Sequence, residues 1–414
     1  MSGKNIVVAQ SGGPTVAINA SLAGVISAAL NNNYYDKVYG SIYGILGILN
    51  DNLIDLTKKA TDNSDFIDTL KVSPAMYLGS CRHKLPEYED DEKPYLTIFE
   101  QFEKYNIGAF FYIGGNDSMD TTLKLSHYGE KIGSDIRIIG IPKTIDNDLC
   151  LTDHTPGFGS AAKYIATSML EISHDTFIYS VPSVTIVEIM GRDAGWLTAS
   201  AALARNEYNS SPHLIYFPEV PFDKEAFIND IKQQLTVRNN VIIAVSEGIR
   251  DKDGQYISAT TATNDQFGHK QLSGTGKSLE YLVKNNIDIK VRSVELNVLQ
   301  RCASHQASLT DINESFELGQ KAVDFSEKGH TKCMLVIKRV SDDPYTTEID
   351  TADISSIANK DKPIPREWIN SSGNDVTDNL IKYMKPLIEG ETAVKYKDGL
   401  PIYLPIDHLD NTTK

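Results

Sequence analysis

The sequence predicts an α/β protein built from two doubly wound layers, each a parallel sheet covered by helices on both faces. Short runs rich in β-branched residues alternate with segments of helical periodicity along most of the 414 residues. The strand-like runs are continuously apolar, as in parallel sheets that are buried on both faces. We place the break between the two layers near LCLTDHTPGFGS (149–160).

The first elements are predicted in the following order. NIVVAQ (5–10) predicts a strand. It is followed by a predicted helix whose apolar face consists of Ile18, Leu22, Val25 and Ala29. Pro94 is well placed to open a further helix. We expect the buried side of that helix to be Leu96, Phe99 and Phe102.

Six more strands are predicted: AFFYIGG (109–115), IRIIGIP (136–142), SVTIVEIMG (183–191), HLIYFPE (213–219), NVIIAVSEG (240–248) and KCMLVIKR (332–339). After Pro344 the regular alternation of strands and helices ends. We therefore expect residues 344–414 to form a peripheral C-terminal extension.

Composition excludes several classes of partner. No apolar run approaches a membrane span and the first residues lack the pattern of a signal peptide, so we expect no membrane partner. The four cysteines are scattered without a CxxC pair, which argues against a disulfide framework or a zinc site and favours a reducing, cytoplasmic location. The formal net charge of −15 argues against binding to nucleic acid or to anionic membranes.

Three glycine-containing turns each follow a predicted strand: QSGGPTVAIN (10–19), YIGGNDSMD (112–120) and EIMGRDAGW (188–196). One such turn alone is weak evidence, since many tight connections use glycine. Together they predict a cleft for phosphate, because the free N–H groups and the dipole of a helix start favour an anion. In open parallel sheets such a cleft lies at the carboxyl ends of the strands.

The segment GIPKTIDNDL (140–149) concentrates Lys143, Thr144 and two aspartates directly after a strand. Asp146 and Asp148 alternate, so in an extended loop they would lie on the same side of the chain. One carboxylate can act as general base on a hydroxyl while the other orients it or contacts a metal. A capped loop is the alternative, but a lysine and two acids downstream of two glycine turns are the parts that phosphoryl transfer requires.

These motifs resemble the phosphofructokinase family. SGGPTVAIN, GGNDS, PKTIDND, EIMGR, SEG and QR occur in this order between Ser11 and Arg301. The resemblance implies two Rossmann-like doubly wound domains with the active site in the cleft between them. It implies a donor domain over 1–150 and a sugar-phosphate domain over 151–343, with some later segments returning to the first domain.

The resemblance also implies roles for individual residues. Asp146 would be the general base and Mg²⁺ the cofactor. The residues implied on the sugar side are Thr144, Ile145, Asp148, Met190, Gly191, Arg192, Glu247, Arg292 and Arg301. Those implied at the donor phosphates are Gly12, Gly13 and Arg82. Each arginine suits a charge-assisted, often bidentate, contact with phosphate.

Two positions bear on the phosphate donor. ATP-using members resemble GGDGS and PGTIDND, whereas this chain has Asp117 and Lys143 in place of the glycines. The Asp117 carboxylate would fill and charge the space for the α-phosphate of ATP, and Lys143 would stabilise a leaving phosphate. The pair is similar to the pyrophosphate-dependent branch, which implies reversible phosphoryl transfer from pyrophosphate to the 1-hydroxyl of fructose 6-phosphate.

Three positions depart from the family pattern. Asn116 stands where the family usually has an aspartate associated with Mg²⁺, so the metal would be held by fewer protein ligands, through water, or by Asp117. Ser183 lies where ATP-dependent relatives have an arginine that crosses from another subunit. Val298 replaces a histidine near the sugar phosphate, and His305 lies close to it in sequence. The resemblance implies a homo-oligomer, either a dimer or a tetramer.

Three alternatives stay open at this point. They are an ATP-dependent 6-phosphofructokinase, a pyrophosphate-dependent kinase of sedoheptulose 7-phosphate, and a catalytically silent regulatory subunit. Asp117 and Lys143 argue against the first, and the retained Asp146 and Arg192 argue against the last. A nicotinamide-binding protein is disfavoured because no GxGxxG follows a predicted strand.

Overall fold

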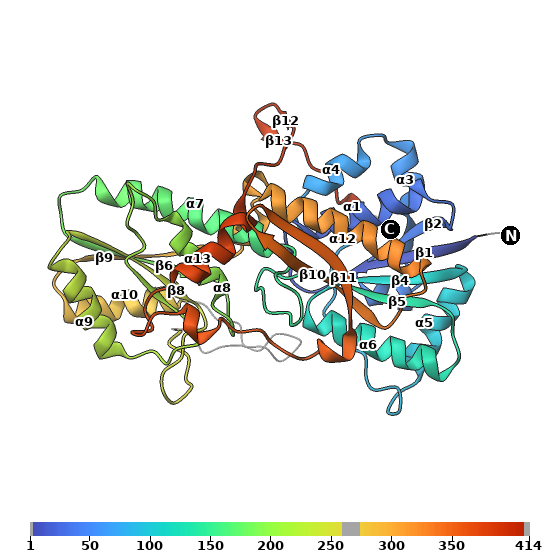
Figure 1. Ribbon diagram of the computed structural model, residues 1–414, viewed down its shortest axis with the longest axis horizontal. Coiled ribbons are helices and arrows are strands. Elements are labelled where there is room, and N and C mark those ends of the chain that lie inside the picture. The colour runs from blue at the N-terminus through green and yellow to red at the C-terminus, as the bar shows by residue number, and fades with distance from the viewer. Residues whose placement is uncertain (1–2, 259–273, 410–414) are drawn as a thin grey trace.

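Two sheets lie at opposite ends of an elongated molecule (Figure 1). The computed structural model describes residues 3–258 and 274–409. One sheet has seven strands in the order β11-β10-β5-β4-β1-β2-β3, and the other has four in the order β7-β8-β6-β9. All neighbouring strands are parallel except at β3 and β11, which pair antiparallel at the two edges of the larger sheet. The predicted α/β fold with two doubly wound sheets is confirmed.

The strands of the larger sheet are β1 (Lys4–Gln10), β2 (Tyr35–Ser41), β3 (Leu53–Asp55), β4 (Ile107–Gly114), β5 (Arg137–Pro142), β10 (Cys333–Asp342) and β11 (Tyr345–Asp353). Those of the smaller sheet are β6 (Ser183–Ile189), β7 (Leu214–Tyr216), β8 (Asn240–Ser246) and β9 (Lys290–Glu295). A separate hairpin is formed by β12 (Tyr396–Lys397) and β13 (Leu400–Pro401).

The α-helices are α1 (Ile18–Asn31), α2 (Ile45–Leu49), α3 (Leu56–Asp62), α4 (Phe66–Val72), α5 (Lys93–Lys104), α6 (Asn116–Lys131), α7 (Phe158–Phe177), α8 (Trp196–Ser200), α9 (Lys224–Leu235), α10 (Thr275–Asn286), α11 (Leu299–Cys302), α12 (Leu309–Glu327) and α13 (Asp378–Met384). Within the described ranges, none of these helices has both the length and the apolar character needed to cross a membrane.

The larger sheet is covered on both faces, which explains its continuously apolar strands. Successive residues of β1 point to opposite sides: Ile6 and Val8 pack under α1 and α12, whereas Val7 and Ala9 pack under α5 and α6. The helices α1 and α12 pack so closely that a Cβ on Gly24 would collide with the carbonyl of Phe316. The predicted face of α1 is buried as expected.

The smaller sheet also separates two cores. On one face α7, α8 and α13 bury Phe158, Trp196 and Leu380 against β6 and β8. On the other face α9 and α10 bury Phe227 and Leu279. Both faces therefore exclude water, and only the ends of the strands remain open for polar side chains.

One predicted helix face is partly wrong, and one predicted strand is too long. Phe102 is buried and Phe99 is partly buried as expected, but Leu96 is 50% exposed, and α5 buries Tyr95 and Ile98 in addition. The contact with β4 and α6 centres the buried face of α5 on Tyr95, Ile98 and Phe102. The predicted strand 213–219 shortens to Leu214–Tyr216, because Pro218 cannot donate to a sheet ladder.

The expectation of a peripheral C-terminal segment is wrong up to about residue 388. β11 pairs with β10 along nine residue pairs and forms an edge of the larger sheet. Further along, residues of this segment join the core of the smaller sheet: Ile364, Ile369, Val376, Leu380, Met384 and Leu387. In Figure 1, β10 and β11 lie near the middle of the molecule, and α13 lies over the smaller sheet. The segment therefore ties the two sheets together.

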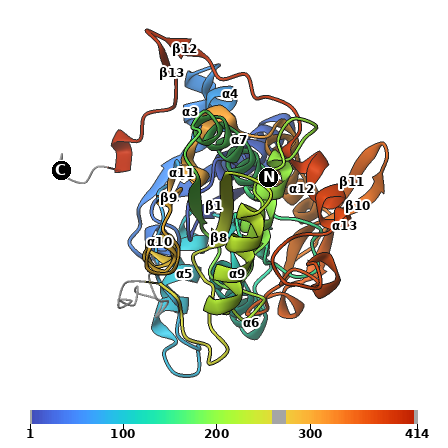
Figure 2. The ribbon, with the colours of Figure 1, turned by 90° about the vertical axis from the view of Figure 1, so that its left-hand side faces the viewer.

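Only the last part of the described chain forms an arm. The β12–β13 hairpin projects from the body, and the chain then runs to a short 3₁₀-helix at Asp407–Leu409 (Figure 2). The arm returns to the larger sheet's domain at its end, where the Tyr43 hydroxyl donates to the carbonyl of Leu409.

Candidate active site

The polar turns predicted from the sequence meet at the carboxyl ends of neighbouring strands. β1, β4 and β5 are adjacent in the larger sheet, so the turns that follow them lie side by side. A cleft of about 460 Å³ is shared by these turns and by the turn after β6. Its lining residues are Gly12, Gly13, Lys84, Gly115, Asn116, Asp117, Ser118, Lys143, Thr144, Asp146, Asp148, Arg192, Asp193, Ala194, Asn359 and Asp361.

Lys143 joins the turns after β5 and β1. Its Nζ donates a 2.8 Å hydrogen bond to the carbonyl of Gly13. Gly12 has a φ of +82°, and a Cβ there would lie 3.1 Å from Lys143 Nζ, so both the backbone and the lysine favour glycine. Burial lowers the pKa of Lys143 to about 8, although Asp146 and Asp148 oppose this shift. The ammonium group therefore remains mostly charged at pH 7 and is aimed at the glycine turn.

Asp146 and Asp148 lie in the same cleft. The backbone N–H of Asp146 donates to Thr144 Oγ1 at 3.1 Å, and the Thr144 hydroxyl lies 3.4 Å from Asp146 Oδ2. Burial raises the pKa of Asp146. Burial, followed by the charges of Asp146 and Asp361, raises the pKa of Asp148 to about 7. Carboxylates with raised pKa values are suited to accept a proton near neutral pH.

Asp117 occupies the first turn of α6. The N-cap residue of this helix is Gly115, which provides no side-chain cap. A carboxylate in the first turn interacts favourably with the positive end of the helix dipole. The N-terminus of α6, where a helix would bind a ligand phosphate, therefore already carries the negative charge of Asp117.

On the side of the smaller sheet, the turns after β6 and β8 are joined. The N–H of Gly191 lies 3.4 Å from Glu247 Oε1, and Ser246 Oγ donates to the carbonyl of Gly191. Burial raises the pKa of Glu247 to about 7, and the negative charge of Asp146 adds to this shift. Glu247 and Arg192 therefore lie close enough to Asp146 to influence it electrostatically.

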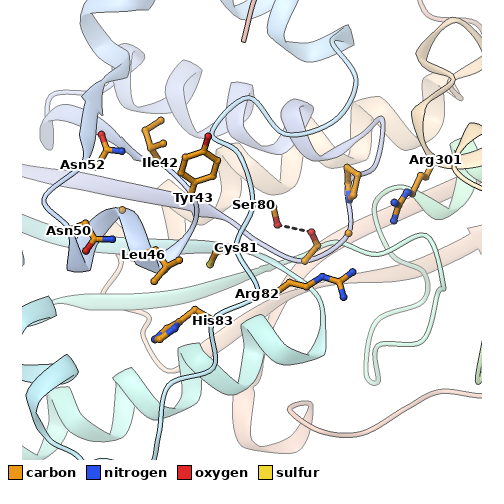
Figure 3. A pocket seen from close by; sticks show the side chains of 14 residues that line it. Ile42, Tyr43, Leu46, Asn50, Asn52, Ser80, Cys81, Arg82, His83 and Arg301 are labelled. Atoms are coloured by element: carbon orange, nitrogen blue, oxygen red, sulfur yellow. Dashed lines mark hydrogen bonds between the residues drawn. The ribbon is translucent and has the colours of Figure 1, made fainter. Parts of the chain in front are cut away.

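A second, larger cavity adjoins the same glycine turn (Figure 3). Its volume is about 810 Å³, and it brings together Gly12, Gly13, Arg82 and Arg301. A Cβ on Gly13 would lie 3.3 Å from Arg301 Nη1. Burial lowers the pKa of Arg301, and the nearby positive charge of Arg82 contributes. Two guanidinium groups from distant parts of the chain thus approach the turn after β1.

Five of the nine predicted sugar-side residues line neither this cavity nor the cleft: Ile145, Met190, Gly191, Glu247 and Arg292. Ile145 is buried in the apolar core of the smaller sheet. Met190 packs against the same core, and its N–H lies 3.4 Å from Gln300 Oε1. Arg292 lies on β9, where it bonds to Asp175 (2.7 Å) and Thr176 in a separate small pocket that it shares with Ser183. Within one chain, the expected grouping of Arg292 with Arg301 is wrong, because β9 presents it near the start of the strand rather than at its carboxyl end.

The site residues predicted from the sequence did not include seven residues of the cleft: Lys84, Gly115, Ser118, Asp193, Ala194, Asn359 and Asp361. Four of them, Gly115, Ser118, Asp193 and Ala194, lie inside the predicted glycine turns, and Lys84 lies two residues after the predicted Arg82. Asn359 and Asp361 had no such signal, because they belong to the segment that we expected to be peripheral. Asn116 Nδ2 donates to Asp361 Oδ1 at 2.9 Å, which connects this segment to the start of α6.

The cleft has the oxygen donors that a magnesium ion prefers. Five carboxylates face it, namely Asp117, Asp146, Asp148, Asp193 and Asp361, against the cations of Lys84, Lys143 and Arg192. In the part of the chain that is described, no three His, Cys, Asp or Glu side chains converge on one point as a metal cage. Mg²⁺ is usually held by one or two carboxylates together with substrate phosphates, and the donor set fits that arrangement.

Glycine turns, a buried lysine and paired aspartates at the ends of parallel strands define a phosphoryl-transfer enzyme of two α/β domains. The chain belongs to the phosphofructokinase family, since the family model described as Phosphofructokinase matches residues 5–326. The resemblance inferred from the motifs is confirmed.

Several named proteins are similar to this chain over nearly its whole length. The pyrophosphate–fructose 6-phosphate 1-phosphotransferase of Halomonas elongata is 40% identical over 97% of this chain and 96% of its own length. The protein of the same name from Methylococcus capsulatus is 39% identical over 98% of this chain and 96% of its own. The crystal structure of a pyrophosphate-dependent phosphofructokinase from Nitrosospira multiformis superimposes with a TM-score of 0.87 at 38% identity, covering 97% of this chain and 96% of that one.

Proposed function

We propose that the protein transfers a phosphoryl group reversibly from pyrophosphate to the 1-hydroxyl of fructose 6-phosphate, giving fructose 1,6-bisphosphate and phosphate. The observation that carries this proposal is the placement of Asp117 and Lys143 in one cleft at the ends of β4 and β5. Near-full-length relatives named for the same reaction support it.

Asp117 accounts for the choice of donor. Two like charges about 4 Å apart repel by about 4 kcal/mol at an effective dielectric constant of about 20. A third phosphate held near the start of α6 would meet this repulsion. Pyrophosphate needs no third phosphate position, and Lys143 offers its leaving phosphate a cation beside the Gly12–Gly13 turn.

Asp146 acts as the general base. It takes the proton of the sugar 1-hydroxyl while that oxygen attacks the near phosphorus of pyrophosphate in line, and the bond to the bridging oxygen breaks. The leaving phosphate takes the electron pair of that bond. Thr144 and Lys143 hold Asp146 and the donor turn in place. Arg192 and Arg301 are the guanidinium groups available for the sugar phosphate, and their fixed planes suit a bidentate contact.

Magnesium fits this cleft as the cofactor. Asp117 and Asp148 would hold it together with the donor phosphates, and it would supply neutralising charge on their oxygens. Asn116 replaces the expected family carboxylate; its Nδ2 donates to Asp361 Oδ1, while its buried Oδ1 has no hydrogen-bond partner within the described residues and is the atom that would face a metal.

The proposal is tested by supplying pyrophosphate and ATP separately to the purified protein with Mg²⁺ and fructose 6-phosphate. Activity with pyrophosphate alone supports it. Activity with ATP alone contradicts the role of Asp117. Activity only after sedoheptulose 7-phosphate replaces the acceptor would favour the second alternative, and inactivity with every pair would favour a silent subunit.

We also propose a homo-oligomer, either a dimer or a tetramer, in the cytoplasm. Arg292 and Ser183 share a pocket of about 80 Å³ near exposed Ile178, Tyr179 and Val181, an apolar surface suited to a second copy. Light scattering of the purified protein tests the assembly, and Tyr179→Asp should weaken it.

The four cysteines carry free thiols, which suits the proposed location in a reducing cytoplasm. Fractionation of the source cells tests this location.

A further inference from the structure

The loop that carries Asp146 and Asp148 is held through the residue between them. Asn147 has a left-handed backbone with a φ of +55° and is 0% exposed. Its Nδ2 donates to Tyr383 Oη at 2.9 Å, and its Oδ1 accepts from the N–H of Thr155 at 3.2 Å. Because the peptide planes on either side of Asn147 lead directly to the two aspartates, a change in the backbone dihedrals of Asn147 moves the carboxylates relative to each other.

Tyr383 is itself rigidly placed. Its hydroxyl donates to the carbonyl of Asp153 at 2.7 Å while it accepts from Asn147. Its ring lies against Trp196 and Trp368, with centroids 5.5 Å and 5.3 Å away. The Arg339 guanidinium lies over the same ring at 4.6 Å. A phenol with both hydrogen-bonding roles used and its ring packed from several sides has little freedom to move.

Lys362 holds the loop from a second direction. Its backbone N–H donates to the carbonyl of Asp148 at 2.7 Å, and its Nζ donates to the carbonyls of Thr152 (3.0 Å) and Asp153 (2.8 Å). The carbonyl of Lys362 accepts from Trp196 Nε1 at 2.8 Å. The backbone of the aspartate loop is thus braced at both Asn147 and Asp148.

Tyr383 and Lys362 both lie beyond residue 326, where the match to the family model ends. Neither lines the cleft of about 460 Å³ among the residues that the structure describes. We propose that Tyr383 and Lys362 are positioning residues that set Asp146 and Asp148 for phosphoryl transfer. Tyr383 acts by way of Asn147, and Lys362 acts by way of the carbonyls of Asp148, Thr152 and Asp153. This inference rests on the proposed function.

The first test is the kinetics of Tyr383→Phe in the full-length protein. We expect kcat to fall by about tenfold or more, because an unsatisfied buried amide rotates Asn147 and small displacements of a base are costly. The KM for each substrate should stay within about twofold, since no group that contacts substrate is removed. Tyr35→Phe is the matched control, because Tyr35 is also buried and its hydroxyl bonds to Ser326. Both of these residues lie in the domain of the larger sheet, away from the aspartate loop.

Tyr35→Phe should lower the melting temperature by a similar amount and leave kcat unchanged. A kcat for Tyr383→Phe within twofold of the wild type would overturn the inference, as would a rise in KM that accounts for the whole loss. If the wild type shows no turnover with pyrophosphate and fructose 6-phosphate, the proposed function fails instead, so the two failures are distinguishable.

A double-mutant cycle tests the route through Asn147. Asn147→Gly keeps the left-handed backbone but removes the side chain. Adding Tyr383→Phe to Asn147→Gly should cause no further loss of kcat, because the two changes break the same contact. If the two substitutions together reduce kcat by the product of their separate effects, Tyr383 does not act through Asn147 and the inference is overturned.

If Tyr383→Phe does not fold, Lys362→Met replaces it in the kinetic test, with the same criteria for kcat and KM.

Discussion

The Nζ of Lys143 lies 2.8 Å from the carbonyl oxygen of Gly13, to which it donates a hydrogen bond. This bond connects the turn after β5 to the turn after β1 across the intervening strand β4. A cation from one motif therefore forms part of the phosphate-binding turn of another. The donor site is an assembly of neighbouring strand ends and does not belong to any single motif.

Replacing this cation should slow the reaction. In Lys143→Met the leaving phosphate loses its positive partner while most of the buried volume is kept. We expect kcat to fall by about 10²–10³-fold, as when a preorganised charge donor is removed. Steady-state kinetics with pyrophosphate measures the effect, and Lys224→Met, an exposed lysine on α9, serves as the control. Unchanged kcat would remove Lys143 from the catalytic group.

Removing the base should affect turnover more than binding. In Asp146→Asn the side chain keeps its shape and loses the ability to accept a proton. We expect kcat to fall by about 10²–10⁴-fold with little change in the KM for fructose 6-phosphate. Initial rates over a range of sugar concentrations separate the two parameters. A rise in KM with kcat preserved at saturation would reassign Asp146 to substrate binding.

Removing the carboxylate at the start of α6 should admit ATP. Asp117→Gly leaves the helix N-terminus free to hold a third phosphate. We expect measurable ATP binding by calorimetry, together with weaker use of pyrophosphate. Asp117→Gly combined with Lys143→Gly should deviate from the sum of the single effects, because both residues face one ligand. A folded Asp117→Gly variant that does not bind ATP would show that this carboxylate alone does not exclude it.

A buried histidine should make stability depend on pH. His154 lies between Asp153 (2.8 Å) and Glu314 (2.7 Å). Burial lowers its pKa, but the charges and hydrogen bonds of the two acids outweigh this and raise it to about 9. Because the folded pKa exceeds the unfolded one, the stabilisation is fully present below about pH 6.5 and is lost as the pH rises through about 9.

Urea denaturation at several pH values measures this dependence. The free energy of unfolding of the wild type should fall between pH 6.5 and pH 9 by more than that of His154→Gln. The exposed His305→Gln serves as the control and should follow the wild type. A parallel decline in all three proteins would mean that His154 does not contribute to the pH dependence.

Much of the donor site could be predicted because its residues follow strands directly. Gly12, Asp117 and Lys143 lie within four residues of the ends of β1, β4 and β5, and strand ends in a parallel sheet converge. Arg292 could not be placed in this way, since its position along β9 depends on the register with β6. The face of α5 was ambiguous for a similar reason, because spacing indicates an apolar face but not which neighbours cover it.

The sequence by itself determined the strand–turn–helix order, the covered parallel sheets and the motifs at their edges, because these depend on periodicity and on residues that are neighbours along the chain. Only the tertiary structure decided that β10, β11 and α13 join the two sheets, that Asp361 reaches the start of α6, and that Lys362 and Tyr383 reach the aspartate loop. Those contacts join residues more than 200 positions apart. No local pattern records them, since they arise from the packing of already formed elements against one another.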